Sequence, residues 1–305
     1  MRFKPQPRHL LIALCAALVL TLAVVGQYHR LFERAWFNVA HAFGPAREQT
    51  LGLADYRAVI QHQPIEGLPA DVSALTFDPE RRSLFTVTNK NAELVELSLD
   101  GVILRRIRLV GFGDPEGVAY VSPGAFVISD ESKQRLLAVH IDAHTLTLDA
   151  ADAEQTLLDI GGRRNRGLEG LAYDHTHQRL FVANEQSPAT IYEVSGFPRG
   201  DDASQPVTIT RSLTRDGGLF VRDLSSLHVD QRFGHLLALS DQSRLLLELD
   251  TNRQPISALS LRKGPSGLRE TIPQAEGVAM DDQGNIYMVS EPNLFYVFKK
   301  PTPER

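Results

Sequence analysis

Cysteine is nearly absent from this chain of 305 residues, because Cys15 is the only one. A single cysteine excludes a disulfide framework and a zinc site built from cysteines. The sequence also lacks a Gly-x-Ser-x-Gly nucleophile elbow and a P-loop. Gly111, Gly113 and Gly117 depart from the spacing of the dinucleotide fingerprint. The formal net charge is −5, which argues against a nucleic acid as the partner.

Acidic residues are missing before Glu33. The charged residues ahead of it are all basic: Arg2, Lys4, Arg8 and Arg30. Residues 10–26 (LLIALCAALVLTLAVVG) carry no charge, and their length is close to the minimum for a membrane-spanning helix. The end of this run, Val24–Gly26, is a poor match to the small-residue cleavage site of a signal peptide. We therefore expect an uncleaved membrane anchor, with a cleaved signal peptide as the alternative.

The N-terminal charges also predict an orientation, because basic residues ahead of an apolar helix stay in the cytoplasm. We expect a cytoplasmic basic tip over residues 1–9, a transmembrane helix over 10–26 and a juxtamembrane stalk over 27–50. The remaining residues, 51–305, then form a body on the periplasmic side of the inner membrane. The chain would be a single-pass membrane protein whose first partner is the bilayer.

The body contains a seven-residue motif that recurs five times, with Glu at its second position in three copies and Ser in two. The copies are Val72–Asp78, Pro115–Val121, Leu168–Asp174, Leu224–Asp230 and Ala275–Asp281. Each copy is followed by a turn, a second apolar run that ends in polar residues, and a third apolar run. Short runs of this composition, bounded by turn residues, are typical of β-strands.

Repeated units of about four strands are the blades of a β-propeller. The sequence therefore predicts an all-β fold, a five-bladed β-propeller over residues 51–305, with a six-bladed ring or an open solenoid as alternatives. The last unit supplies only three strands before Pro301. Tyr56–Gln63 is strand-like and belongs to no other unit, so we expect it to complete the last blade and close the ring.

Polar residues of different blades are expected to meet at one mouth of the channel. In a blade, the start of the inner strand and the end of the second strand lie at the same end, because the two strands are antiparallel. The three repeated glutamates, Glu116, Glu169 and Glu276, begin inner strands. The polar residues that end or follow the second strands include Asn89, Asp130, Glu131, Asn184, Glu185, Asp241 and Glu291.

Converging carboxylates repel one another and are costly to desolvate, and a bound cation relieves both effects. The repeated donors are oxygens, with no repeated His or Cys, which favours Ca²⁺ over zinc or copper. The alternative is structural: the glutamate caps backbone amides at the start of the strand, and the following glycine allows a tight turn.

Two basic loops lead into inner strands and would lie on the same face as the glutamates. Their cationic residues are Arg163, Arg164 and Arg166 in one loop and Arg262, Lys263 and Arg269 in the other. These side chains are candidates for binding a phosphate or another anion, or they balance the acidic mouth. His175 and His177 could chelate a metal, but they belong to a turn at the opposite end of their blade, and we expect a solvated turn there.

Several segments resemble one known family. They are Phe126–Glu131, Leu168–Tyr173, Gln274–Asp281 and Gly284–Asn293, together with the membrane-plus-stalk start. They resemble the SdiA-regulated, YjiK-like family over the whole chain. The resemblance implies a five-bladed propeller, a bound calcium ion and a distant relation to NHL-repeat propellers, several of which bind proteins. It implies no ligand set for the metal.

A partial resemblance to the calcium-dependent propeller phytases accompanies it. The chain departs from their pattern at four positions: Ser73, Lys90, Ser225 and Gln242. We therefore expect a calcium-binding propeller that serves as a binding module for a protein or a small anionic ligand. The alternative is a calcium-dependent hydrolase, phytase-like or lactonase-like, that uses the same mouth.

Overall fold

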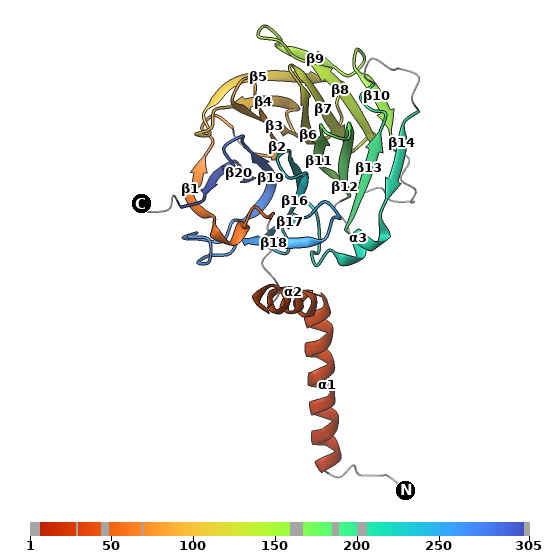
Figure 1. The fold of residues 1–305 in the computed structure, drawn as a ribbon, viewed down its shortest axis with the longest axis vertical. Helices are drawn as coiled ribbons and strands as arrows, with labels where there is room; N and C mark the ends of the chain where they lie inside the picture. The colour runs from red at the N-terminus through yellow and green to blue at the C-terminus, as the bar shows by residue number, and fades with distance from the viewer. Residues whose placement is uncertain are drawn as a thin grey trace. The chain divides into compact units, whose positions relative to one another are not determined.

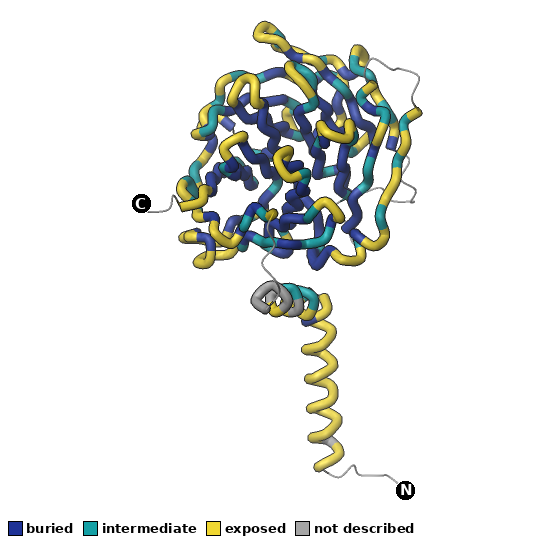
Figure 2. The backbone as a smooth tube through the Cα atoms, in the orientation of Figure 1, coloured by how far each residue is buried: buried dark blue, intermediate teal, exposed yellow. Residues whose placement is uncertain are grey.

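The computed structural model describes residues 7–28, 30–43, 49–68, 70–158, 167–184, 189–199 and 206–301. The chain divides into two compact units, residues 1–47 and residues 48–305. The first unit contains α1 (Pro7–Tyr28) and α2 (Leu31–Phe43). Within α1, Leu11–Tyr28 is long and apolar enough to cross a membrane, and nearly all of its side chains are exposed (Figure 2). A signal sequence near the N-terminus meets the same criterion.

The second unit is a ring of five antiparallel blades (Figure 1). From the channel outward, blade one contains β2 (Val72–Asp78), β3 (Ser83–Thr88), β4 (Glu93–Leu97) and β5 (Ile103–Val110). Blade two contains β6 (Pro115–Ser122), β7 (Ala125–Asp130), β8 (Arg135–His140) and β10 (Glu154–Leu157). Blade three contains β11 (Leu168–Asp174), β12 (Arg179–Asn184), β13 (Thr190–Ser195) and β14 (Thr208–Arg211).

The ring continues through the C-terminal half of the chain. Blade four contains β15 (Ser226–Asp230), β16 (His235–Ser240), β17 (Leu245–Leu249) and β18 (Pro255–Ser260). Blade five contains β19 (Gln274–Met280), β20 (Ile286–Glu291), β21 (Leu294–Lys299) and, from the other end of the sequence, β1 (Arg57–Pro64). Each inner strand contacts the inner strands of both neighbouring blades, and β19 contacts β2. The predicted five-bladed propeller is confirmed.

The ring closes through β1, as the unassigned strand-like segment predicts. β1 runs antiparallel to β21, with Arg57 opposite Lys299 and Pro64 opposite Leu294. A short 3₁₀ helix, η1 (Leu53–Asp55), precedes it. β21 is thereby hydrogen-bonded on both sides, which removes the open edge that would otherwise invite aggregation.

The hydrophobic core lies between neighbouring blades. One cluster joins blades four and five through side chains such as Leu246 and Met288, and another joins blades one and two through Phe85 and Phe126. The inner strand β2 is buried at every residue, whereas the outer strand β1 alternates between exposed and half-buried positions. Figure 2 shows this gradient from the buried centre of the ring to its exposed rim. It explains why the inner strands read as continuous apolar runs.

Two elements lie outside the predicted pattern of four strands per blade. β9 (Thr147–Asp149) follows β8 and pairs in parallel with β5, so blade one carries a fifth strand at its rim. A short helix, α3 (Leu213–Gly218), follows β14, and Ser212 caps it by accepting a hydrogen bond from the Arg215 backbone amide. Both elements lie at the rim, where the sequence repeat places no constraint.

Candidate metal centre and channel cavity

The repeated glutamates occupy β-bulges at the start of three inner strands. Glu116 is the extra residue between the pairs Pro115 with Asp130 and Gly117 with Ser129. Register shifts likewise enclose Glu169 in β11 and Glu276 in β19. A bulge leaves the extra residue out of the ladder and re-aims its side chain. We call this end of the channel, where the inner strands begin, the glutamate mouth.

The glycine after each of these glutamates allows neighbouring inner strands to approach closely. A Cβ at Gly117 would lie 2.8 Å from the Glu169 carbonyl oxygen, and one at Gly277 would lie 2.5 Å from the Ala74 carbonyl carbon. Both distances are shorter than van der Waals contact allows. In each Glu-Gly pair, the glutamate thus forms a bulge and the glycine allows neighbouring inner strands to pack closely around the channel. The structural alternative instead assigns the glycine to a tight turn.

Three carboxylates gather at the start of blade two. Asp114, Glu116 and Glu131 each offer an oxygen within 4.8 Å of the other two, and all three residues are half-buried. The Glu131 backbone amide donates to the Asp114 carbonyl at 2.8 Å, and the Gly167 amide donates to Glu131 Oε1 at 2.8 Å. Asn89 Nδ2 donates to Glu116 Oε1 at 2.8 Å from blade one. This cluster of hard oxygen donors could hold a metal ion.

The glutamate mouth is unfavourable for negative charge. Burial raises the pKa of Glu116 to about 7, and the charges of Asp114 and Glu131 act in the same direction against hydrogen bonds that lower it. Burial raises the pKa of Glu276 to about 8, helped by Asp241 and Glu291 and by Glu116 itself. The repeated glutamates were expected to repel one another, and Glu116 and Glu276, from different blades, do so.

The other residues of the predicted site are placed differently. Asp130 accepts hydrogen bonds from Gly113 N and Asp114 N, both at 3.1 Å, and pairs with Arg135, so its carboxylate holds the loop that carries Asp114. Asp241 pairs with Arg244.

Three further residues were predicted as metal ligands. Asn184 lies at the end of β12 and Glu291 at the end of β20, and Glu185 lies outside the described residues. Asp114 was not among the predicted ligands, because its position in the repeat carries Gly167 and Gln274 in the other two glutamate-bearing units.

The basic loops do not join the acidic cluster in the described part of the chain. Arg163, Arg164 and Arg166 lie outside the described residues. Arg262, Lys263 and Arg269 are exposed. Their loop is held against the outer strand β1, because Ala58 N donates to the Ser266 carbonyl at 2.9 Å and Arg269 N donates to Gln61 Oε1 at 2.7 Å.

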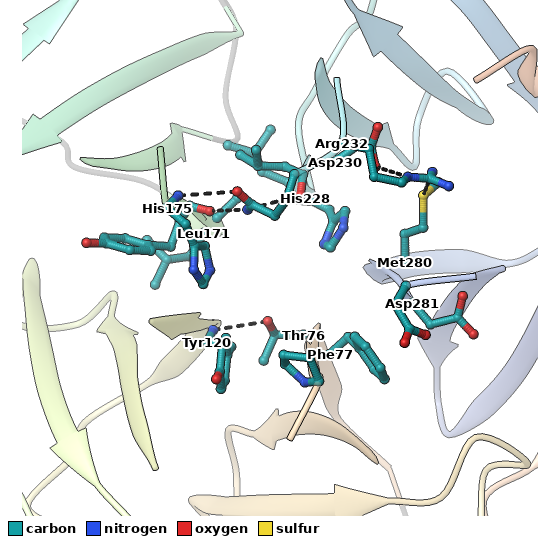
Figure 3. Close-up of a pocket in the computed structure, with 17 residues that line it drawn as sticks. Thr76, Phe77, Tyr120, Leu171, His175, His228, Asp230, Arg232, Met280 and Asp281 are labelled. Atoms are coloured by element: carbon teal, nitrogen blue, oxygen red, sulfur yellow. Dashed lines mark hydrogen bonds and ion pairs between the residues drawn. The ribbon is translucent and has the colours of Figure 1, made fainter. Parts of the chain in front are cut away.

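A cavity of about 340 Å³ lies where the inner strands end, and we call this end of the channel the far mouth. All five inner strands line it, as Figure 3 shows. His175 and Tyr120 lie on one side and Met280 on the opposite side, with His228 between them. The predicted site did not include this cavity. One sequence feature points to it: at the position of His228 the other motif copies have Thr76, Ala119, Ala172 and Ala279.

The two histidines of the β11–β12 turn have separate roles. His177 Nδ1 lies 2.8 Å from Asp174 Oδ2 and is exposed. The His175 ring stacks on Tyr120, with 5.8 Å between ring centroids and 20° between ring planes. His177 therefore belongs to the turn, whereas His175 belongs to the wall of the cavity.

The fold defines a five-bladed β-propeller with an acidic mouth and a cavity at the far mouth. Residues 48–299 match the SdiA-regulated family, and the chain belongs to that family. It is similar in fold to a luciferin-regenerating enzyme, at 11% identity over 79% of this chain and 95% of that one, with a TM-score of 0.49. It is also similar to a streptogramin B lyase, at 6% identity over 82% and 99% of the two chains, with a TM-score of 0.45.

A third similar structure is a virginiamycin B lyase from Staphylococcus aureus, at 11% identity over 81% and 75% of the two chains, with a TM-score of 0.42.

Proposed function

We propose that the chain is a membrane-tethered, extracytoplasmic β-propeller that holds Ca²⁺ at its glutamate mouth and serves as a binding module for a protein or small ligand. The observation that carries the calcium proposal is the cluster of Asp114, Glu116 and Glu131, whose oxygens lie within 4.8 Å of one another. Its donors are all carboxylates, and burial and repulsion disfavour the charged form of Glu116, so the residues fit a hard divalent cation.

The three residues of this cluster would hold the ion, and Ca²⁺ would neutralise the charge that gathers at the glutamate mouth. Asp114 lies in the loop that enters β6, Glu116 in the bulge of β6 and Glu131 just after β7. An ion there would tie the start of the inner strand to the end of the second strand. We therefore expect calcium to stabilise blade two rather than to complete a catalytic set.

Calcium should raise the melting temperature of the protein, and a chelator should lower it. Binding to the folded state alone stabilises by RT ln(1 + [L]/Kd), which is about 2.7 kcal/mol at a hundredfold excess over Kd. For a domain of this size, that is on the order of 5–10 °C. Thermal unfolding of metal-free protein with and without Ca²⁺ measures it.

Glu116→Gln should abolish most of this calcium-dependent shift, because it removes a charged ligand while keeping the side chain's size. The matched control is Glu80→Gln, an exposed glutamate in the β2–β3 turn, which should leave the shift unchanged. Equal melting curves of metal-free protein with and without added Ca²⁺ would favour a purely structural role for these carboxylates.

The tethering proposal rests on α1 and its basic flank. Full-length protein should remain in the membrane fraction, and protease added outside spheroplasts should digest the propeller. A variant that lacks residues 7–28 should lose the membrane association. Recovery of a soluble, shortened form from wild-type cells would identify the segment as a cleaved signal peptide, and protection from external protease would contradict the orientation.

A further inference from the structure

Aromatic rings form much of the wall of the far-mouth cavity. Phe77, Tyr120, Tyr173 and His175 are all part of its lining. Its volume of about 340 Å³ suits a small molecule. Planar side chains pair with planar ligands by offset stacking or edge contacts. The shape and composition of the wall therefore favour a flat, largely apolar occupant.

His228 adds a polar group to the lining of the cavity. Among the described residues, no group forms a hydrogen bond with its ring nitrogens, although it lies within the inner strand β15. Burial lowers the pKa of His228 to about 4, so its imidazole is neutral at physiological pH. A neutral imidazole offers one donor and one acceptor. Small side chains at this position in the other motif copies leave room for the ring in the channel.

Most charged groups around the cavity are paired with protein groups, whereas Asp230 Oδ2 is buried without a hydrogen-bond partner among the described residues. Asp230 Oδ1 lies 2.8 Å from Arg232 Nε, and Asp282 Oδ2 lies 2.9 Å from Arg82 Nη1. Asp281 accepts hydrogen bonds from its own turn and from the Tyr287 hydroxyl at 2.8 Å. A ligand with a full charge would have to compete with these interactions, so the lining favours a neutral one.

We propose that the far-mouth cavity binds a neutral, planar aromatic molecule of two or three fused rings that places one polar group against His228. The aromatic wall receives the ring system, and His228 orients the molecule by a hydrogen bond. This proposal deepens the binding role proposed above by assigning it a site and a ligand class. It requires neither calcium nor export, so failure of the tests for those features leaves it standing.

The test compares three probes against the full-length protein: naphthol, naphthalene and naphthalene sulfonate. Naphthol has the fused rings and a hydroxyl group, naphthalene lacks the hydroxyl, and the sulfonate adds a charge. Titration followed by probe fluorescence measures each affinity. We expect naphthol to bind more tightly than naphthalene by about fivefold to tenfold, which corresponds to one net hydrogen bond, and the sulfonate to bind most weakly.

His228→Phe should reduce naphthol affinity to that of naphthalene and leave naphthalene binding within about twofold, because it removes only the hydrogen-bonding group. His175→Ala should weaken naphthol and naphthalene alike, because it removes part of the aromatic wall. His175 is exposed, so this second variant keeps the test valid if the phenylalanine variant misfolds. His144→Phe, at an exposed histidine in the β8–β9 loop, is the matched control.

Equal naphthol affinity in wild type and His228→Phe would overturn the role of His228. Tightest binding of the sulfonate would overturn the assignment of a neutral ligand. Absence of binding by all three probes to folded wild-type protein would overturn the proposal as a whole. If binding persists unchanged when calcium is removed, this site and the metal centre are independent, as the proposal requires.

Discussion

A chain that begins at Ile65 should fail to fold, whereas a chain that begins at Gln49 should unfold cooperatively. The shorter chain lacks β1 and the segment before it, including Leu51, Leu53 and Tyr56, which are at most 2% exposed. Burying three such side chains contributes roughly 5–9 kcal/mol. This is comparable to the whole stability of a typical domain, about 5–15 kcal/mol.

The loss of β1 also uncovers a strand that is poorly suited to an edge. β21 is almost entirely buried and apolar (LFYVFK), so its free side would pair with other molecules. Circular dichroism, thermal unfolding and size-exclusion chromatography of the two chains measure the difference. Equal melting temperatures for the two chains would show that the ring does not depend on β1.

The number of blades could be predicted because each blade repeats the same local sequence pattern. A Glu-Gly, Ser-Ala or Ser-Ser start, an aliphatic inner strand and a polar end recur in register, and Tyr56–Gln63 was the strand-like segment left unassigned. β9 could not be predicted in the same way. It contributes three residues that pair in parallel with β5 across the rim, and nothing in its own sequence encodes that partner.

The candidate sites show a similar division. Glu116 and Glu131 were expected at one mouth, because antiparallel pairing of an inner and a second strand determines their positions. Asp114 depends on the path of a loop that the repeat does not share. The far-mouth cavity is formed jointly by side chains from the ends of all five inner strands. In the sequence, only His228 marks it, because the other motif copies have a small residue at that position.

Glu248→Ala should destabilise the propeller by about 3–5 kcal/mol, the typical cost of removing one partner from a buried pair. Glu248 lies on β17 and is fully buried. Its Oε1 lies 2.7 Å from His235 Nδ1 and accepts a hydrogen bond from the Leu51 amide at 2.7 Å, while Oε2 accepts one from Thr50 Oγ1 at 2.8 Å. One carboxylate thus attaches the segment that leads into β1 to blade four.

Alanine at position 248 would leave the His235 ring and the Leu51 amide buried without these acceptors, and it would release the segment that precedes the closing strand. Glu248→Gln keeps one acceptor oxygen and should cost less than the alanine variant. Glu270→Gln, whose side chain is 73% exposed, should change the free energy of unfolding by less than about 0.5 kcal/mol. Denaturant unfolding gives these values, and hydrogen exchange at the Leu51 amide shows whether the segment detaches. An alanine variant as stable as wild type, with Leu51 still protected, would show that β1 closes the ring without this anchor.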